Sequence, residues 1–143
     1  MIRFKDEQER QRILTALELN MNEEFRATLQ YICHRISARG LDEVIADSFK
    51  SAGLDEMSHI LFFSDLITKC GGVPHFSEWN IDRSTDLATM LAKDIELEQA
   101  ARARYTEQLK FMADYPELCT VIQSVLQDEQ DHEETFQAYL ANL

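Results

Sequence analysis

Apolar residues recur along most of the chain at alternating intervals of three and four residues, the spacing of one face of an α-helix. Four segments carry such a stripe, and each is roughly 25 to 30 residues long, which is long for a globular helix. In the first segment, for example, the stripe passes through Leu17, Met21, Thr28 and Tyr31. No segment alternates with a period of two, so we expect helices and no strands.

Helix-breaking residues fall in three places and separate the four segments. Ser37–Gly40 and Asp114–Pro116 are short, so each predicts a tight antiparallel helical hairpin. Cys70–Arg83 is the longest break and contains Gly71, Gly72 and Pro74. Two hairpins joined by a long connection are therefore expected.

The middle connection has a length that suggests its path. A helix of about 28 residues is about 42 Å long, and the 12 residues of Gly71–Asp82 reach about 40 Å when extended. The connection can therefore run the length of the bundle and bring the third helix parallel to the second. We expect Ser84 to cap the third helix, and Pro116 to lie in the first turn of the fourth, next to an N-cap at Asp114 or Tyr115.

Composition agrees with an all-α domain. The 143 residues, expected to form one domain over 1–143, include only four Gly and two Pro, and 45% are hydrophobic. The net charge of −12 argues against a nucleic-acid partner, because phosphate binding requires a basic face. Cys33, Cys70 and Cys119 form no CxxC pair, so neither a cysteine zinc site nor a disulfide framework is indicated.

The sequence also indicates a location. No apolar run approaches the ~18 residues of a membrane span, so we expect no membrane partner. Met1–Arg12 is charged throughout and does not read as a secretory signal. We therefore expect a cytoplasmic protein.

Charged and imidazole side chains lie on the apolar stripes. Buried carboxylates are costly unless they are paired with positive charge or metal. No Lys lies on these stripes, and Arg35 lies one turn beyond Tyr31, away from the cluster. The candidate ligands of a shared cation are Glu24, Glu56, His59, Glu98, Glu129 and His132.

The same pattern occurs twice. Glu56 and His59 form a Glu-x-x-His motif that recurs 73 residues later, and this spacing places both side chains on one helical face. Each predicted hairpin supplies one more glutamate from its first helix, and these two, Glu24 and Glu98, are 74 residues apart. The chain therefore reads as two halves related by a pseudo-two-fold axis.

The donor set suggests a dinuclear metal centre. Four carboxylates and two imidazoles balance two divalent ions, and oxygen-rich ligation suits iron or manganese better than zinc. Glu56 and Glu129 are the simplest bridges. The remaining ligands would be Glu24 with His59 for one ion and Glu98 with His132 for the other.

These motifs resemble those of bacterioferritins, within the ferritin-like superfamily, over roughly residues 19–140. The matching stretches are Asn22–Phe25 with Gln30, Tyr31 and His34, then Leu54–His59, Gly71–Pro74 and Leu126–His132. The resemblance implies a ferritin-like four-helix bundle in which the six residues bind a di-iron ferroxidase centre. It further implies oxidation of ferrous iron by oxygen or peroxide and storage of the product as a ferric mineral.

The chain departs from bacterioferritins in two ways. It stops at Leu143, 11 residues after His132, whereas these proteins usually continue into a short fifth helix. We expect no fifth helix and a homo-oligomer of at least two copies. The missing helix argues against the 24-subunit shell and against storage itself. At the inner-surface iron site of the family, Ser51 replaces a histidine and only Asp55 remains.

Met57 matches the haem-ligating methionine of the resembled family, so haem b is a possible second cofactor. Its position one residue after Glu56 turns it about 100° away from the metal-facing side of the helix. An outward methionine suits a subunit interface, and ordinary packing by a flexible side chain is the alternative.

Two other functions remain open. The first is a rubrerythrin-like peroxide-reducing protein, whose third helix usually carries an extra glutamate one turn before the terminal ligand; here Ile95 holds that place, beside Asp94. The second is a small metal-binding helical oligomer that stores nothing.

Other polar residues are expected to have lesser roles. We place His34 at the surface or in an interface, His75 in solvent, and most of the acidic run from Asp128 to Glu134 on a solvated face. Tyr31 and Tyr105 each follow a candidate glutamate by seven residues. They could hydrogen-bond a ligand carboxylate or serve as ordinary core tyrosines.

Overall fold

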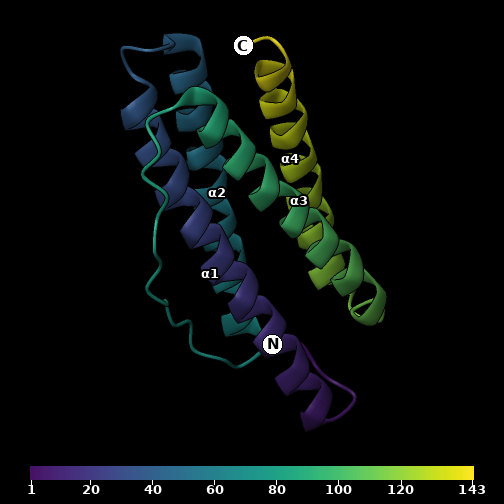
Figure 1. The fold of residues 1–143 in the computed structure, drawn as a ribbon. Coiled ribbons are helices and arrows are strands. Elements are labelled where there is room, and N and C mark those ends of the chain that lie inside the picture. Colours follow the sequence, from purple (N-terminus) through teal and green to yellow (C-terminus); the bar gives the residue numbers. More distant parts are fainter.

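A computed structural model describes residues 1–143 and contains four helices and no strands (Figure 1). The helices are α1 (Glu7–Ala38), α2 (Glu43–Lys69), α3 (Leu87–Phe111) and α4 (Pro116–Ala141). α1 packs along α2 and α3 packs along α4, and α1 also contacts α3 while α2 contacts α4. The predicted all-α bundle of two hairpins is confirmed. No helix is both long enough and apolar enough to cross a bilayer.

Side chains that accept backbone hydrogen bonds fix the starts of three helices. Asp6 caps α1 and Asp42 caps α2, as acceptors from backbone N–H groups of the first turn. The prediction that Ser84 caps α3 is wrong. Asp86 caps α3 by accepting from Thr89 N at 2.8 Å, while the Ser84 N–H is directed to Asp82 instead. At α4 the expected proline in the first turn is present, after Tyr115 as N-cap.

The chain between α2 and α3 runs along the outside of α1, from the end of α2 to the far end of the bundle (Figure 1). Two side chains of α1 hold it by its backbone. The Asn22 amide donates to His75 O at 2.9 Å and accepts from Ser77 N at 2.6 Å. The Gln30 amide makes the same two bonds to Asp82, each at 2.7 Å. The crossover is thus an ordered strap, as its length suggested.

His34 is completely buried, so its expected place at the surface is wrong. Its Nδ1 lies 2.6 Å from an Asp94 oxygen and its Nε2 lies 2.9 Å from an Asp82 oxygen. Burial alone would lower the pKa of His34, but the hydrogen bonds and charges of the two aspartates outweigh it and raise the pKa. The strap and α3 together cover a helix face that the sequence pattern leaves open to solvent.

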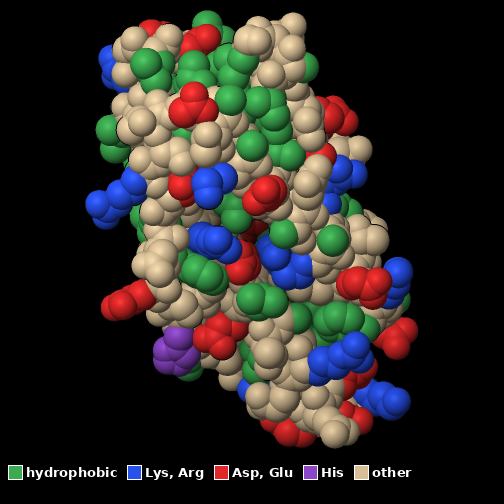
Figure 2. Space-filling model, viewed as in Figure 1, with side chains coloured by type: hydrophobic (Ala, Val, Ile, Leu, Met, Phe, Trp, Pro, Cys, Tyr) green, Lys and Arg blue, Asp and Glu red, His purple; other side chains and the backbone are tan.

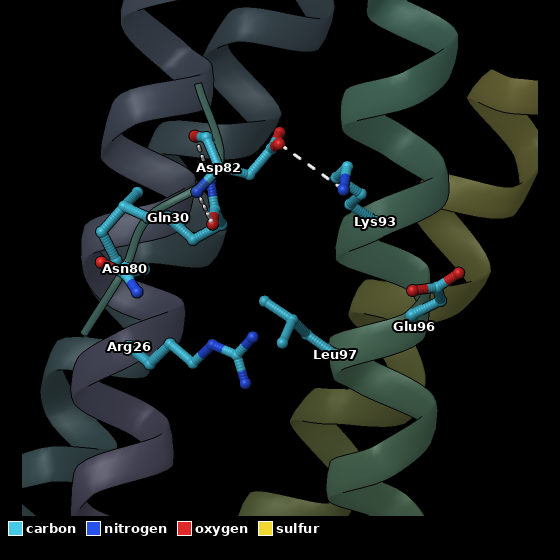
Figure 3. A pocket seen from close by; sticks show the side chains of 8 residues that line it. Arg26, Gln30, Asn80, Asp82, Lys93, Glu96 and Leu97 are labelled. Atoms are coloured by element: carbon cyan, nitrogen blue, oxygen red, sulfur yellow. Dashed lines mark hydrogen bonds and ion pairs between the residues drawn. The ribbon is translucent and has the colours of Figure 1, made fainter. Parts of the chain in front are cut away.

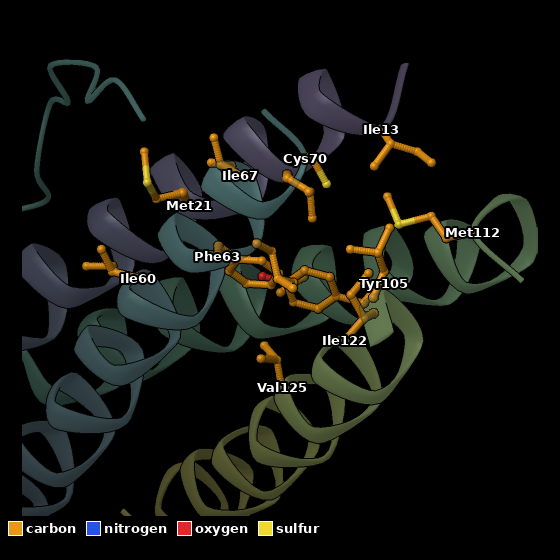
Figure 4. Close-up of a cluster of buried hydrophobic side chains, with 14 residues drawn as sticks. Ile13, Met21, Ile60, Phe63, Ile67, Cys70, Tyr105, Met112, Ile122 and Val125 are labelled. Atoms are coloured by element: carbon orange, nitrogen blue, oxygen red, sulfur yellow. The ribbon is translucent and has the colours of Figure 1, made fainter. Parts of the chain in front are cut away.

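The apolar core has two parts. A cluster of 14 buried residues, among them Ile13, Phe63 and Ile122, fills one end of the bundle (Figure 4). A second cluster of 11 includes Phe49 and Phe136. On each helix the candidate acids lie between the residues of the two clusters, so the core is divided by a polar layer.

Asp82→Asn removes the carboxylate that accepts from His34 Nε2. Because a buried histidine loses a charged partner, we expect the free energy of unfolding to fall by about 1–2 kcal/mol at mildly acidic pH. Desolvation raises the pKa of Asp82, but hydrogen bonds from Ser84 and His34 lower it to about 2. The ion pair therefore stabilises the fold most between about pH 4 and about pH 6.5.

This contribution is lost as pH rises through the raised pKa of His34, and also as pH falls toward the lowered pKa of Asp82. The cost of Asp82→Asn should therefore shrink in alkaline buffer. Urea unfolding of both proteins at the two pH values measures it. Glu78→Gln, an exposed change in the same strap, should cost nothing. A cost for Asp82→Asn that does not change with pH would contradict the ion pair.

Candidate metal centre

The structure brings all six predicted residues together in the polar layer between the two apolar clusters. One set of ligand atoms within 4.8 Å of one another comes from Glu24, Glu56, His59 and Glu129. A second comes from Glu56, Glu98, Glu129 and His132. The two sets share Glu56 and Glu129. We call Glu24 with His59 the α1/α2 position, and Glu98 with His132 the α3/α4 position.

Helical periodicity explains the convergence. α2 and α4 each carry their Glu and His three residues apart, so both side chains leave the helix on one face. α1 and α3 each contribute one glutamate from the same level of the bundle. All six residues are buried.

Each candidate histidine is oriented by an aspartate from the opposite hairpin. His59 Nε2 donates to Asp128 at 2.8 Å, and His132 Nε2 donates to Asp55 at 2.8 Å. Nδ1 of each ring therefore faces the carboxylates, which it approaches at 3.4 Å from Glu24 in one case and 2.9 Å from Glu56 in the other. Such outer hydrogen bonds fix the tautomer of a metal-binding histidine.

Asp128 was expected on a solvated face, and this expectation is wrong in part, because its side chain is half-exposed yet holds His59. The partnership crosses between hairpins, so helical spacing within one segment does not show it. A signal was present all the same, since an aspartate precedes the glutamate in both Glu-x-x-His motifs, at Asp55 and Asp128.

The two tyrosines bridge the halves in the same reciprocal way. Tyr31 of α1 donates to Glu98 of α3, and Tyr105 of α3 donates to Glu24 of α1. Desolvation, followed by the charge of the bonded glutamate, raises the pKa of each phenol well above its usual value. Both tyrosines therefore stay protonated as donors, and each fixes one carboxylate.

The charges of the centre are not balanced by the protein. Desolvation and the neighbouring carboxylates raise the pKa of Glu56 and of Glu129 well above the usual value. Burial lowers the pKa of His59, but Glu24 and Glu129 outweigh it and raise the pKa to about 9. Without metal, the layer therefore retains protons that a cation would displace.

The donor atoms fit a pair of metal ions. Several buried atoms of the centre lack a well-formed hydrogen bond: both carboxylate oxygens of Glu56, Glu98 Oε2, Glu129 Oε1 and His132 Nδ1, the last of which lies 2.9 Å from Glu56 Oε1. Buried polar groups are otherwise almost always satisfied. Unsatisfied atoms that converge from α2, α3 and α4 are what a cation would complete.

Other predicted residues lie away from this layer. Met57 is 48% exposed on α2 and points away from the centre, as expected. His75 is exposed. All three cysteines are free, and of these only Cys70 is buried. Asp94 is buried but bonds His34 rather than a candidate ligand.

The family model of the ferritin-like domain matches residues 14–143. The chain belongs to this family. No curated protein sequence matches it.

Solved structures share the fold at low sequence identity. A dodecameric thioferritin, the bacterioferritin-related protein of Bacteroides fragilis, has 21% identity and a TM-score of 0.86, covering 93% of this chain and 86% of that chain. The Desulfovibrio desulfuricans bacterioferritin, a protein with a di-iron site, has 20% identity and a TM-score of 0.86, with 94% and 81% covered.

A third structure is the Rhodobacter capsulatus bacterioferritin, which has a metal-free dinuclear site and haem iron. It has 18% identity and a TM-score of 0.79, with 91% of this chain and 84% of that chain covered. These likenesses show that the fold is that of bacterioferritins.

Asp128→Asn tests whether the outer hydrogen bonds orient the histidines. We expect the affinity for Co²⁺ to fall by about 10- to 100-fold, because the amide no longer holds His59 with Nδ1 toward the carboxylates. Titration followed by cobalt absorbance measures this. Asp131→Asn, which removes a nearby α4 carboxylate that bonds only Gln127, should bind as the unaltered protein does. Equal affinities for both variants would contradict the orienting role.

Proposed function

We propose that this protein binds two ferrous ions at the centre and oxidises them to ferric iron, with oxygen or peroxide as the acceptor. The observation that carries this proposal is the set of unpartnered carboxylate oxygens in a buried layer where only two imidazoles face four carboxylates. Oxygen-rich ligation with one imidazole per ion suits iron or manganese. The di-iron site of the Desulfovibrio relative supports iron.

Each residue has a proposed role. Glu56 and Glu129 bridge, because each belongs to both sets of donor atoms. Glu24 and Glu98 are terminal oxygen ligands, and His59 and His132 are terminal nitrogen ligands. The tyrosines and the two aspartates hold four of these six side chains in place.

The electron balance is simple. Two Fe²⁺ give up one electron each, and one O₂ takes both with two protons to become hydrogen peroxide; a peroxide acceptor becomes two waters instead. The residues hold the two ions side by side, so that both electrons can reach one acceptor. Iron detoxification, and mineral storage if the assembly encloses a cavity, would follow from this reaction.

A rubrerythrin-like peroxidase is less well supported. Its extra glutamate would lie where this chain has Ile95, and the neighbouring Asp94 is committed to His34. Rapid turnover of peroxide by the ferrous protein, without accumulation of ferric mineral, would favour this alternative.

Replacing both bridges tests the proposed function. We expect Glu56→Ala with Glu129→Ala to slow ferrous oxidation by more than about 100-fold, since loss of shared ligands should exceed the effect of outer hydrogen bonds. Absorbance of ferric product under excess oxygen gives the initial rate. Glu134→Ala, which removes an exposed α4 acid, is the matched control. An unchanged rate of ferrous oxidation in the double variant would show that this centre is not the catalyst.

We further propose that Met57 would ligate a haem on the outer face of the first hairpin. Its thioether is exposed between Leu54 and Leu61, which are also exposed. Haem added to the protein should give the spectrum of sulfur-ligated haem, and Met57→Leu should abolish it. Leu61→Ala alters the same face and keeps the sulfur, so its spectrum should stay at the same wavelengths. A haem spectrum that is unchanged in Met57→Leu would contradict the assignment of Met57 as the haem ligand.

The protein is also proposed to form a homo-oligomer, as the dodecameric relative does. Both α1 and α2 carry exposed apolar side chains, among them Ile32, Ile36 and Leu61. Sedimentation should show more than one copy, and Leu61→Glu should reduce the mass, whereas Val73→Glu on the exposed strap should not. A 24-subunit shell would support storage, and a dimer or small ring would support a metal-binding oligomer without storage. A monomer would contradict assembly.

A further inference from the structure

The two halves of the bundle differ in the buried polar pairs beside the centre. His34 of α1 bonds Asp94 of α3. Gln108 lies 74 positions after His34, and Asn20 lies 74 positions before Asp94, so Asn20 and Gln108 form the corresponding pair. Asn20 Nδ2 donates to Gln108 Oε1 at 2.6 Å, and Gln108 Nε2 donates back to Asn20 Oδ1 at 2.7 Å. One pair carries charge and the other is neutral.

The neutral pair binds an arginine side chain. Arg104 Nε donates to Asn20 Oδ1 at 3.3 Å, and its guanidinium carbon lies 5.0 Å from the centre of the Tyr105 ring. The residue that corresponds to Arg104 in the first half is Gln30, which is neutral and bonds the strap. The pseudo-two-fold relation therefore fails at this position, where the second half has a fixed positive charge and the first half has a neutral amide.

Arg104 faces the carboxylates of the centre. It lines a small cavity at the seam of α1 and α3 together with Glu24, Glu56 and Glu129. Figure 2 shows basic side chains gathered around a hollow in this seam. Figure 3 shows the adjoining groove, where Arg26 of α1 points toward Leu97 of α3.

The guanidinium is charged. Burial opposes the charge of Arg104, but the nearby carboxylates of Glu23 and Glu24 favour it, and its pKa rises. A fixed positive charge lowers the affinity of a nearby site for a divalent cation. The site affected is the α1/α2 position, because its Glu24 accepts from the same Tyr105 that lies beneath Arg104.

The α3/α4 position has a different surrounding. Asp94 lies one helical turn before Glu98, and its imidazole partner His34 is balanced by two carboxylates, those of Asp94 and Asp82. Lys93 is the other cation on this side, and it pairs with Asp82 at 3.6 Å, so no unpaired positive charge is fixed here.

We infer that Arg104 makes the two metal positions unequal, so that the first divalent cation enters the α3/α4 position and the second binds the α1/α2 position more weakly. This inference rests on the proposed dinuclear centre and adds an order of filling to it. Arg104 acts as a specificity-determining residue and not as a ligand.

Anaerobic titration with Co²⁺ tests the order in solution. The unaltered protein should bind two ions per chain in two steps that differ about tenfold in affinity. Arg104→Met keeps much of the side-chain volume and removes the charge, so its second step should tighten by about tenfold while its first step stays the same. Arg102→Met removes an equal charge from α3, where Arg102 pairs with Glu133 at the surface. This control should titrate as the unaltered protein does.

Crystals of the unaltered protein with one equivalent of Co²⁺ test the order without any variant. Anomalous density at the cobalt edge should be stronger at the α3/α4 position. Equal density, or stronger density at the α1/α2 position, would overturn the inference, as would identical titrations of the Arg104 and Arg102 variants. Two ions bound without preference would contradict the order of filling but support the dinuclear centre. Failure to bind two ions would contradict the dinuclear centre itself.

Discussion

Four carboxylates buried in one layer of a helical bundle require a compensating positive charge, and the rest of the structure is arranged around this requirement. Isolated buried carboxylates are strongly unfavourable, and no lysine or arginine forms an ion pair with Glu56, Glu98 or Glu129. The apolar clusters at both ends of the bundle exclude water from the layer and keep the acids together. In the absence of a cation, bound protons must supply the compensation, and this is why the pKa values of Glu56 and Glu129 are raised.

The surroundings of the layer convert a collection of acids into an ordered site. Tyrosine hydroxyls cross between α1 and α3 to hold the terminal glutamates, and aspartates cross between α2 and α4 to hold the histidines. Each bond links the two hairpins, so the same contacts that orient the ligands also join the halves of the bundle. The strap contributes at one end, where Asp82 completes the buried bonds of His34. The strap, the buried polar pairs and Arg104 distinguish one half from the other.

Much of this arrangement follows from local periodicity. The three-and-four spacing predicts the helices, and the repeated Glu-x-x-His motif on the apolar stripes predicts which acids meet, because both are properties of single helices. The contacts of Asp128 with His59 and of His34 with Asp82 depend on which helix faces pack together, so spacing within one segment does not specify them. The prediction of the α3 N-cap was wrong for a related reason. Ser84 and Asp86 are both good N-cap residues, and the bond of Ser84 to Asp82 in the strap decides between them.

Diffraction at the iron absorption edge, from crystals prepared with ferrous iron without oxygen, tests the central claim most directly. We expect two anomalous peaks about 3.5–4 Å apart, both within bonding distance of the Glu56 and Glu129 carboxylates, with one imidazole Nδ1 beside each peak. An iron-loaded crystal in which the layer holds no peak, with the four carboxylates instead turned toward solvent or paired with basic side chains, would contradict it.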